Sequence, residues 1–217
     1  MKADLESGYR QFGVHPVDWK FQVYSNGPNE HYIDLACPFG KTNSALEFCP
    51  PVALFARSVA VRYSEKFSTA PPILGTHVDD IFGGFKDCQD YMEAARFREY
   101  MIEVGSSLSI KFNPKVEKTP LPAQKQVILG RVYNSISKRV TTDQKKIQKY
   151  RLRIAEILAL EFTTRTDVEK LHGCLNYVAD VEPFGRPFLA HLTMAISSTE
   201  EGERVERSSL AKVGLRL

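Results

Sequence analysis

The spacing of apolar residues predicts short strands and two longer helices in the first half of the chain. The strands are expected over residues 21–25, 31–38, 73–78, 81–85 and 108–112. Apolar positions recur at helical spacing over 42–67 and 87–104, which predicts a helix in each range. Pro50 and Pro51 lie inside the first of these ranges. Because proline lacks an N–H and its ring clashes with the preceding turn, we expect that helix to kink or break near Cys49.

Helical patterns dominate the second half of the chain. A hairpin is predicted from two strands, 126–134 and 137–142, and a basic amphipathic helix is predicted over 143–160. The spacing of Thr166 and Glu169 is typical of a capping box, which predicts the start of another helix. The remaining expectations are an end to that helix at 183–185, a last helix over 186–196 and a flexible tail over 197–217. Strands early and helices late indicate an α+β domain followed by a small helical one.

Composition narrows the class of protein only slightly. The 217 residues are 43% hydrophobic and 25% charged, which is ordinary for a globular chain. No apolar run approaches the roughly 18 residues of a membrane span, so no membrane partner is expected. The N-terminus shows no signal or transit pattern. The four cysteines are widely spaced, which argues against zinc and indicates reduced thiols in an intracellular protein, cytoplasmic or nuclear.

The net charge of +3 hides an uneven distribution along the chain. Residues 111–160 hold twelve Lys and Arg against three Asp and Glu, a local charge of +9. Residues 1–110 carry −4 and residues 161–217 carry −2. A compact positive block in a nearly neutral chain indicates a polyanionic partner, and a solvated charged face is the alternative.

Two adjacent carboxylates, Asp79 and Asp80, stand between apolar runs in the stretch THVDDIFGGF. A hairpin would place them at its turn, facing an open cleft. Mg²⁺ prefers one or two carboxylates plus waters and substrate phosphates, and a cation would offset the repulsion between the two acids. A two-metal site needs a further carboxylate, for which Asp4 is the best candidate if its strand is a central one beside the hairpin. The alternatives are a solvated turn and an exposed terminal residue.

Four motifs in this order and spacing resemble the palm of a reverse transcriptase. They are KADLESGYRQFGVHPVDW (2–19), CPFGKTNSALEF (37–48), HVDDIF (77–82) and VILG (127–130). The similarity is to retrotransposon enzymes, gypsy-like or DIRS-like, and residues 167–192 resemble the segment that follows the palm in those elements. The resemblance implies a palm over 1–119, with an antiparallel sheet and helices packed on one face. It also implies a primer-grip-like hairpin over 120–142 and a helical thumb over 143–196.

The resemblance implies RNA-directed DNA synthesis, in which deoxynucleotides are added to a primer on an RNA or DNA template. In this family the acids matching Asp4 and Asp79 bind two Mg²⁺ ions, for which Mn²⁺ could substitute, while Asp80 acts electrostatically near the metals. Tyr9 matches a steric gate against the 2′-hydroxyl, with a core aromatic as the alternative. Lys118 or Lys115 could match the general acid that protonates pyrophosphate.

The resemblance also assigns nucleotide and primer contacts. The incoming nucleotide is expected to lie beside Phe39, Gly40 and Lys41, and the primer end beside Leu129 and Gly130. Contacts to the phosphate backbone of a primer–template duplex are expected from Lys138, Arg139, Lys145, Lys146 and Lys149. No oligomeric state is predicted.

The sequence departs from the family pattern in several respects. A fingers segment before the first motif and a downstream RNase H domain are not seen, so a fragment of a longer protein is expected. His77 replaces the aromatic residue common two positions before the acidic pair. The alternative function is a catalytically inactive nucleic-acid-binding remnant. Other palm-type enzymes, such as nucleotidyl cyclases or RNA polymerases, are disfavoured by Tyr9 and the Pro-Phe-Gly motif.

Overall fold

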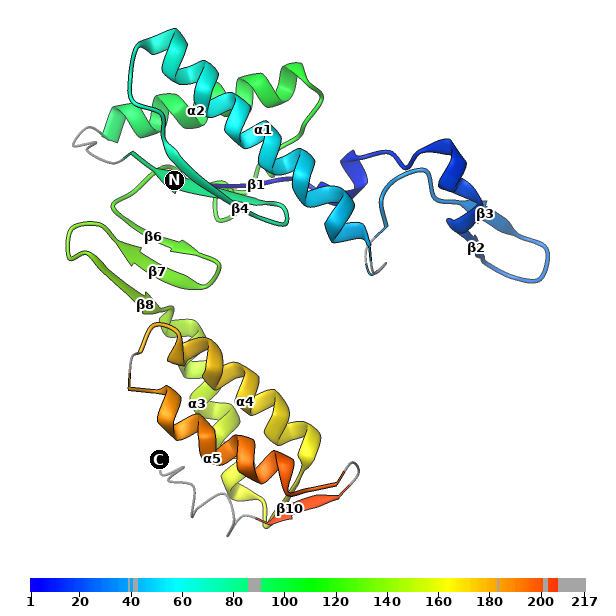
Figure 1. The fold of residues 1–217 in the computed structure, drawn as a ribbon, viewed down its shortest axis with the longest axis vertical. Coiled ribbons are helices and arrows are strands. Elements are labelled where there is room, and N and C mark those ends of the chain that lie inside the picture. The colour runs from blue at the N-terminus through cyan, green and yellow to red at the C-terminus, as the bar shows by residue number, and fades with distance from the viewer. Residues whose placement is uncertain (39, 41–42, 86–90, 183, 201–202, 207–217) are drawn as a thin grey trace. The chain divides into compact units, whose positions relative to one another are not determined.

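A computed structural model describes residues 1–38, 40, 43–85, 91–182, 184–200 and 203–206. The chain divides into two compact units, Met1–Ala123 (unit 1) and Gln124–Leu217 (unit 2), and each has its own hydrophobic core (Figure 1). Both units mix helices with small antiparallel sheets, which confirms the predicted α+β class.

Unit 1 is built on a three-stranded antiparallel sheet. Its strands are β1 (Lys2–Asp4), β4 (Ile73–His77) and β5 (Asp80–Gly84), in the order β1-β5-β4. The helices α1 (Ser44–Phe67) and α2 (Tyr91–Ser107) pack with this sheet around one core (Figure 1). Ala3 and Ile81 are paired across β1 and β5 and are completely buried in that core. Because side chains alternate along a strand, their neighbours Lys2, Asp4 and Asp80 project to the opposite face.

Helix α1 runs without a break through Pro50 and Pro51, so the expectation of a break near Cys49 is wrong. Both prolines are exposed, and the carbonyls deprived of donors belong to the exposed residues Leu46 and Glu47, where water can replace the lost bonds. On either side of the prolines, Phe48 and Val52 are buried. Packing of this apolar face therefore outweighs the local preference against proline.

By length and composition alone, α1 also meets the criterion for a membrane-crossing helix, which the sequence had not led us to expect. The mean hydropathy of an 18-residue segment of α1 reaches 1.3, and 39% of that segment is buried. A helix in the core of a protein meets the same criterion. One side of α1 lies in the core of unit 1, while Leu46, Leu54 and Val61 remain exposed on the other side.

A short arm of unit 1 carries the predicted first hairpin. It follows the 3-10 helices η1 (Gly8–Gln11) and η2 (Pro16–Phe21), and it pairs β2 (Val23–Ser25) with β3 (His31–Ile33). The second strand is shorter than the expected 31–38. The hairpin exposes apolar side chains on β2 and β3, including the stacked pair Tyr24 and Tyr32.

Two other predictions for unit 1 need correction. Residues 108–112 form no strand, because Ser109 has a positive φ of 60° and only Phe112 makes an isolated bridge, to Leu5. Helix α2 continues to Ser107, beyond the expected end at 104. The start expected at 87 lies outside the described residues.

Unit 2 begins with a three-stranded meander instead of the predicted two-stranded hairpin. Its strands are β6 (Lys125–Ile128), β7 (Arg131–Asn134) and β8 (Arg139–Thr142). The range 126–134 is split by a two-residue turn in which Leu129 and Gly130 have φ values of 51° and 75°. Two consecutive positive φ values are typical of a tight hairpin turn.

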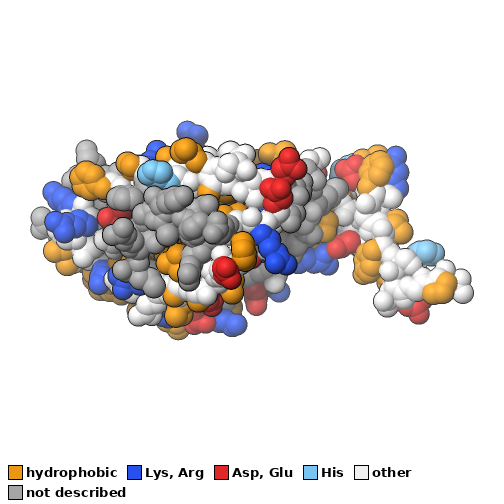
Figure 2. All heavy atoms as spheres, turned by 90° about the horizontal axis from the view of Figure 1, so that it is seen from below, with side chains coloured by type: hydrophobic (Ala, Val, Ile, Leu, Met, Phe, Trp, Pro, Cys, Tyr) orange, Lys and Arg blue, Asp and Glu red, His pale blue; other side chains and the backbone are white. Residues whose placement is uncertain are grey.

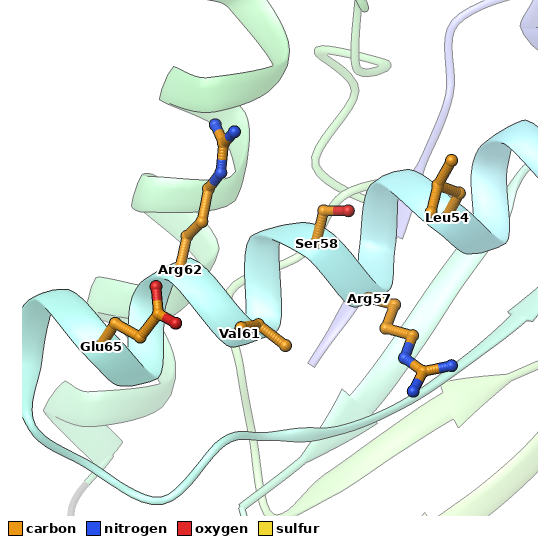
Figure 3. A pocket seen from close by; sticks show the side chains of 6 residues that line it. All are labelled: Leu54, Arg57, Ser58, Val61, Arg62 and Glu65. Atoms are coloured by element: carbon orange, nitrogen blue, oxygen red, sulfur yellow. The ribbon is translucent and has the colours of Figure 1, made fainter.

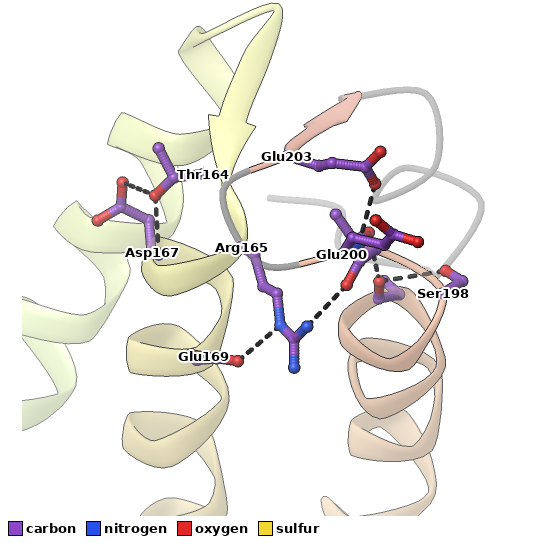
Figure 4. Close-up of polar contacts among 9 residues, drawn as sticks. Thr164, Arg165, Asp167, Glu169, Ser198, Glu200 and Glu203 are labelled. Atoms are coloured by element: carbon purple, nitrogen blue, oxygen red, sulfur yellow. Dashed lines mark hydrogen bonds and ion pairs between the residues drawn. The ribbon is translucent and has the colours of Figure 1, made fainter.

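Three helices follow: α3 (Gln144–Ala159), α4 (Arg165–Ala179) and α5 (Arg186–Ser197). Helix α4 is capped by Thr164, not by Thr166 as predicted, because Thr164 ends strand β9 (Phe162–Thr164) in an extended conformation. Its hydroxyl oxygen accepts a hydrogen bond from the Asp167 N–H at 3.1 Å and donates one to the Asp167 carboxylate at 2.8 Å (Figure 4).

The predicted flexible tail contains a strand, β10 (Arg204–Glu206), which pairs with β9. Val205 is 4% exposed and joins the core of unit 2, so burial of this one apolar residue holds the segment in place. Arg165 ties α4 to the end of α5, since its guanidinium contacts Glu169 at 2.9 Å and the Thr199 carbonyl at 2.8 Å (Figure 4).

Candidate active site

The predicted hairpin exists, but its turn is shifted by one residue, so that Asp79 lies in the turn and Asp80 is the first residue of β5. His77 pairs with Asp80, so Val78 and Asp79 alone form the loop. Val78 has a φ of 53°, a conformation that costs a β-branched residue on the order of 1–3 kcal/mol. The Leu5 N–H donates to the Asp79 carbonyl at 2.9 Å, and Gly8 packs so closely that an added Cβ would lie 3.0 Å from the Asp79 Cβ. The surrounding backbone therefore fixes this strained turn.

Strand β1 brings Asp4 beside the turn. Asp4 is the direct cross-strand partner of Asp80, so both side chains project from the same face of the sheet. Asp4 is only 6% exposed, which rules out the exposed terminal residue considered as an alternative. The expectation of a central strand is wrong, because β5 is central and β1 lies at one end of the sheet.

Asp4 is covered by the segment that follows α2. The Asn113 side-chain amide donates to Asp4 Oδ2 at 3.1 Å, and Lys118 Nζ lies 3.7 Å from Asp4 Oδ1. Burial raises the pKa of Asp4, as do the negative charges of Asp79 and Asp80, while Lys118 and Asn113 act in the opposite direction. The net shift is upward, which reflects the cost of collecting acids at a buried position.

A second lysine holds Asp80. Lys2 Nζ lies 3.1 Å from Asp80 Oδ1, and both side chains are more than four-fifths buried. In the described part of the chain, Asp79 forms no ion pair, and no group of three or more His, Cys, Asp and Glu side chains is arranged to hold a metal ion. The carboxylates suit Mg²⁺ by donor type, but the lysines occupy two of them. Magnesium at Asp4 and Asp79 thus stays a prediction.

The residues expected to surround the nucleotide differ in their exposure to solvent. Tyr9 is 8% exposed and its ring stacks on Phe48 with the two ring centres 4.4 Å apart, so most of the side chain packs in the core of unit 1, and the steric gate stays a prediction. Burial raises the pKa of Tyr9, with a smaller contribution from nearby Asp79. Gly40 is exposed with a φ of 83°, and Phe39 and Lys41 lie outside the described residues.

The geometry separates the two candidate general acids. Lys118 reaches the Asp4 carboxylate and is half exposed, whereas Lys115 is exposed and contributes its backbone carbonyl to the turn that carries Lys118. Lys118 is therefore the lysine at this site.

In unit 2, Leu129 and Gly130, which are expected beside the primer end, form the turn between β6 and β7 within the range predicted as one strand. Lys146 was expected on a phosphate backbone, but its Nζ lies 4.0 Å from the centre of the Tyr177 ring. The other predicted cations are exposed and form no ion pair with any described residue: Lys138, Arg139, Lys145 and Lys149. On the face of the molecule drawn in Figure 2, Lys and Arg side chains alternate with acidic and apolar ones.

Sequence reasoning missed Lys2, Asn113 and Tyr177. Lys2 stands two residues before Asp4, so strand periodicity could have placed both on one face. Asn113 is 109 residues from Asp4 and Tyr177 is 48 residues from Leu129, and nothing in the local pattern connects them.

A shallow hollow of about 430 Å³ lies elsewhere in unit 1, on the outer side of α1 (Figure 3). It is lined by Leu54, Arg57, Ser58, Val61, Arg62 and Glu65. None of these residues belongs to the carboxylate site, so the hollow has no part in the chemistry considered there.

No family model matches the sequence, and no curated protein is similar to it. Solved structures share its fold, among them two complexes of a foamy viral enzyme. A foamy viral protease-reverse transcriptase in complex with double-stranded DNA superimposes with a TM-score of 0.72 at 14% identity, over 98% of this chain and 34% of the viral one. The same type of enzyme in complex with an RNA/DNA hybrid gives a TM-score of 0.69 at 14% identity, over 99% and 26%. The chain thus spans about a third or less of these proteins, and its fold is that of part of a reverse transcriptase.

Proposed function

We propose that this chain is the palm and thumb portion of an RNA-directed DNA polymerase from a retroelement, gypsy-like or DIRS-like. The observation that carries the proposal is the convergence of Asp4, Asp79 and Asp80 at one strained hairpin turn. The reaction is the transfer of a deoxynucleotide to the 3′-hydroxyl of a primer, with an intracellular nucleic-acid template as partner.

The arrangement of charge supports this role. Gathering three carboxylates near one another is costly, and Asp79 lacks a counter-charge in the described part of the chain. Two magnesium ions held by Asp4 and Asp79 would supply that charge and would activate the primer hydroxyl and the triphosphate. Lys118, which pairs with Asp4, is proposed to protonate the leaving pyrophosphate, and Tyr9 is proposed to disfavour ribonucleotides.

The structural neighbours and the basic block support a nucleic-acid partner. The neighbours were solved with double-stranded DNA and with an RNA/DNA hybrid. In this chain, Lys138, Arg139, Lys145 and Lys149 are proposed to contact phosphates without reading the sequence. Such binding weakens steeply as the salt concentration rises.

Primer extension on an RNA template tests the catalytic proposal. We expect Mg²⁺-dependent incorporation of deoxynucleotides that falls by about 100-fold or more in Asp79→Asn, because one negative charge facing the metals is lost. Glu103→Gln, which removes the charge of an exposed acid on α2 outside the four motifs, serves as the control and should retain full activity. Equal extension by wild type and Asp79→Asn would overturn the catalytic proposal.

A second function is favoured by the two lysines at the acids. Lys2 on Asp80 and Lys118 on Asp4 offset two of the three carboxylates without metal, which suits a nucleic-acid-binding remnant that no longer catalyses. For such a remnant, wild type and Asp79→Asn would bind an RNA/DNA hybrid equally and extend nothing. Removing the four exposed cations should then lower the slope of log affinity against log salt by about 3 to 4.

A further inference from the structure

The turn that joins β6 and β7 is held in an unfavourable conformation. Leu129 has a φ of 51°, a region that non-glycine residues seldom adopt, and Gly130 follows at 75°. A leucine stays in such a conformation only where the surroundings determine it. The question is which contacts hold this turn.

Each carbonyl of the turn accepts a hydrogen bond from a different helical segment. The Tyr177 hydroxyl of α4 donates to the Leu129 carbonyl at 2.6 Å. The backbone N–H of Asp143, the residue that caps α3, donates to the Gly130 carbonyl at 3.2 Å. The turn is therefore fastened at two adjacent points by two helices that are far apart from it in sequence.

The Tyr177 ring is itself fixed by two cations. Lys146 Nζ of α3 lies 4.0 Å from the ring centre, and the Arg131 guanidinium lies 5.0 Å from it. Arg131 also pairs with Asp180 at 2.8 Å, one turn beyond Tyr177. Cations at these distances are attracted to the face of an aromatic ring. The end of the Lys146 side chain in turn occupies the space of a Gly130 side chain, since a Cβ there would lie 2.2 Å from Lys146 Nζ and 2.4 Å from its Cε.

We propose that Tyr177 is a positioning residue, which sets the location of the Leu129–Gly130 turn so that the turn can receive the end of a nucleic-acid duplex. The identity of the ligand, the end of a nucleic-acid duplex, rests on the proposed function. The restraint of the turn by the Tyr177 side chain, here called the clamp, rests only on the contacts of Tyr177. A preorganised turn gains affinity because it does not have to be ordered when the ligand binds.

Hydrogen exchange measured by mass spectrometry tests the clamp without any substrate. In Tyr177→Phe the ring and its cations remain and only the hydroxyl is lost. We expect amide exchange in residues 125–134 to rise roughly fivefold, while residues 166–178 exchange as in wild type. Tyr133→Phe is the matched control, because the Tyr133 hydroxyl, on β7, makes no hydrogen bond with any described residue. Unchanged exchange in Tyr177→Phe would overturn the clamp.

Binding of a fluorescent RNA/DNA hybrid tests the positioning role. We expect the dissociation constant to rise roughly fivefold in Tyr177→Phe and to stay constant in Tyr133→Phe, with equal melting temperatures. A purely structural Tyr177 would instead lower the melting temperature and leave the dissociation constant of the folded protein unchanged, which would overturn the proposal. If wild type binds no hybrid, the proposed function fails as well. If wild type binds and Tyr177→Phe binds equally, only the positioning role fails.

Discussion

Two hairpin turns, one in each unit, share an unusual local conformation and differ in what supports it. Val78 in unit 1 and Leu129 in unit 2 are both apolar residues at the first position of a two-residue turn, with φ values of 53° and 51°. The first turn is supported by backbone and core packing through Leu5 and Gly8. The second is supported by the side chain of Tyr177 and the cap of α3.

The difference follows from the charge that each turn carries. The unit 1 turn lies among carboxylates, and the two of them on the neighbouring strands, Asp80 and Asp4, are paired with Lys2 and Lys118. The unit 2 turn consists of the uncharged residues Leu129 and Gly130. The neighbouring lysine, Lys146 of α3, therefore packs on the ring of Tyr177. A strained turn can thus be retained by electrostatics and burial or by hydrogen bonds from neighbouring helices, and the two supports should respond differently to mutation.

The largest effect is expected from Lys2→Met. It leaves Asp80 Oδ1 buried without a hydrogen bond or a counter-charge, which should lower the free energy of unfolding of unit 1 by about 3 kcal/mol. Urea unfolding followed through Trp19, the single tryptophan of the chain, reports on unit 1. The variants in unit 2 that are compared below are followed by far-UV circular dichroism, because Trp19 lies in unit 1.

The control for Lys2→Met is an exposed ion pair in unit 2. Arg186 pairs with Asp180 while its own side chain is 71% exposed, so Arg186→Met should cost less than about 0.5 kcal/mol. In the double variant Lys2→Met with Asp80→Asn, most of the lost stability should return, because no charge is left unpaired. Equal losses of unfolding free energy in Lys2→Met and Arg186→Met would contradict the claim that the buried Lys2–Asp80 pair stabilises unit 1.

An intermediate effect is expected from a methyl group added beside each turn. At Gly8 the new Cβ would lie 2.8 Å from the Phe48 ring and 3.0 Å from the Asp79 Cβ, inside a packed core, so Gly8→Ala should cost about 2 to 3 kcal/mol. At Gly130 the nearest atoms belong to the end of the flexible Lys146 side chain, which can move aside. Gly130→Ala should therefore cost only about 1 kcal/mol, because alanine is unfavourable at a positive φ. Urea midpoints of the two variants measure the difference, and the reverse order would show that the supports have been assigned to the wrong turns.

Patterns local in sequence predicted much of the fold and the centre of the site. Alternation located the β4–β5 hairpin, and the strand-like stretch around Asp4, together with the resemblance to the family motif, placed Asp4 beside it. The same patterns missed the turn at Leu129, because a run of apolar residues through a leucine at positive φ looks like one continuous strand. They also overstated the effect of Pro50 and Pro51, whose cost is offset by buried neighbours far along the chain.

The parts that sequence could not predict depend on contacts between distant residues. The pairing of Asp4 with Asn113 and of Leu129 with Tyr177 follows from the tertiary fold. The capping residue of α4 is Thr164 because strand β9 ends there, and pairing with β10 cannot be read from the local motif at Thr166. Lys146 is a further example. A contact with phosphate was expected from the sequence, and only the fold shows that Lys146 Nζ lies over the Tyr177 ring.

The smallest effect in this series is a change in how stability depends on pH, tested with Asp4→Asn in the absence of divalent metal. Burial raises the pKa of Asp4 in the folded state, with Asp79 and Asp80 adding to the shift. The folded state then binds the proton more tightly than the unfolded chain, so this group adds stability as the pH falls through its raised pKa and subtracts stability above it. At neutral pH, Asp4→Asn should therefore make unit 1 more stable in urea.

Asp167 in unit 2 provides the opposite sign. Its hydrogen bond from Thr164 and the nearby Arg153 lower its pKa below the ordinary value. A depressed pKa contributes stability above the unfolded value, and that stability is lost as the pH falls through the folded pKa, so Asp167→Asn should destabilise unit 2 at neutral pH. Urea midpoints of both variants at pH 7 and near pH 4 measure the two signs. If Asp4→Asn and Asp167→Asn shifted stability in the same direction, Lys118 would outweigh burial at Asp4, and the carboxylate turn would be no more strained electrostatically than the capped helix.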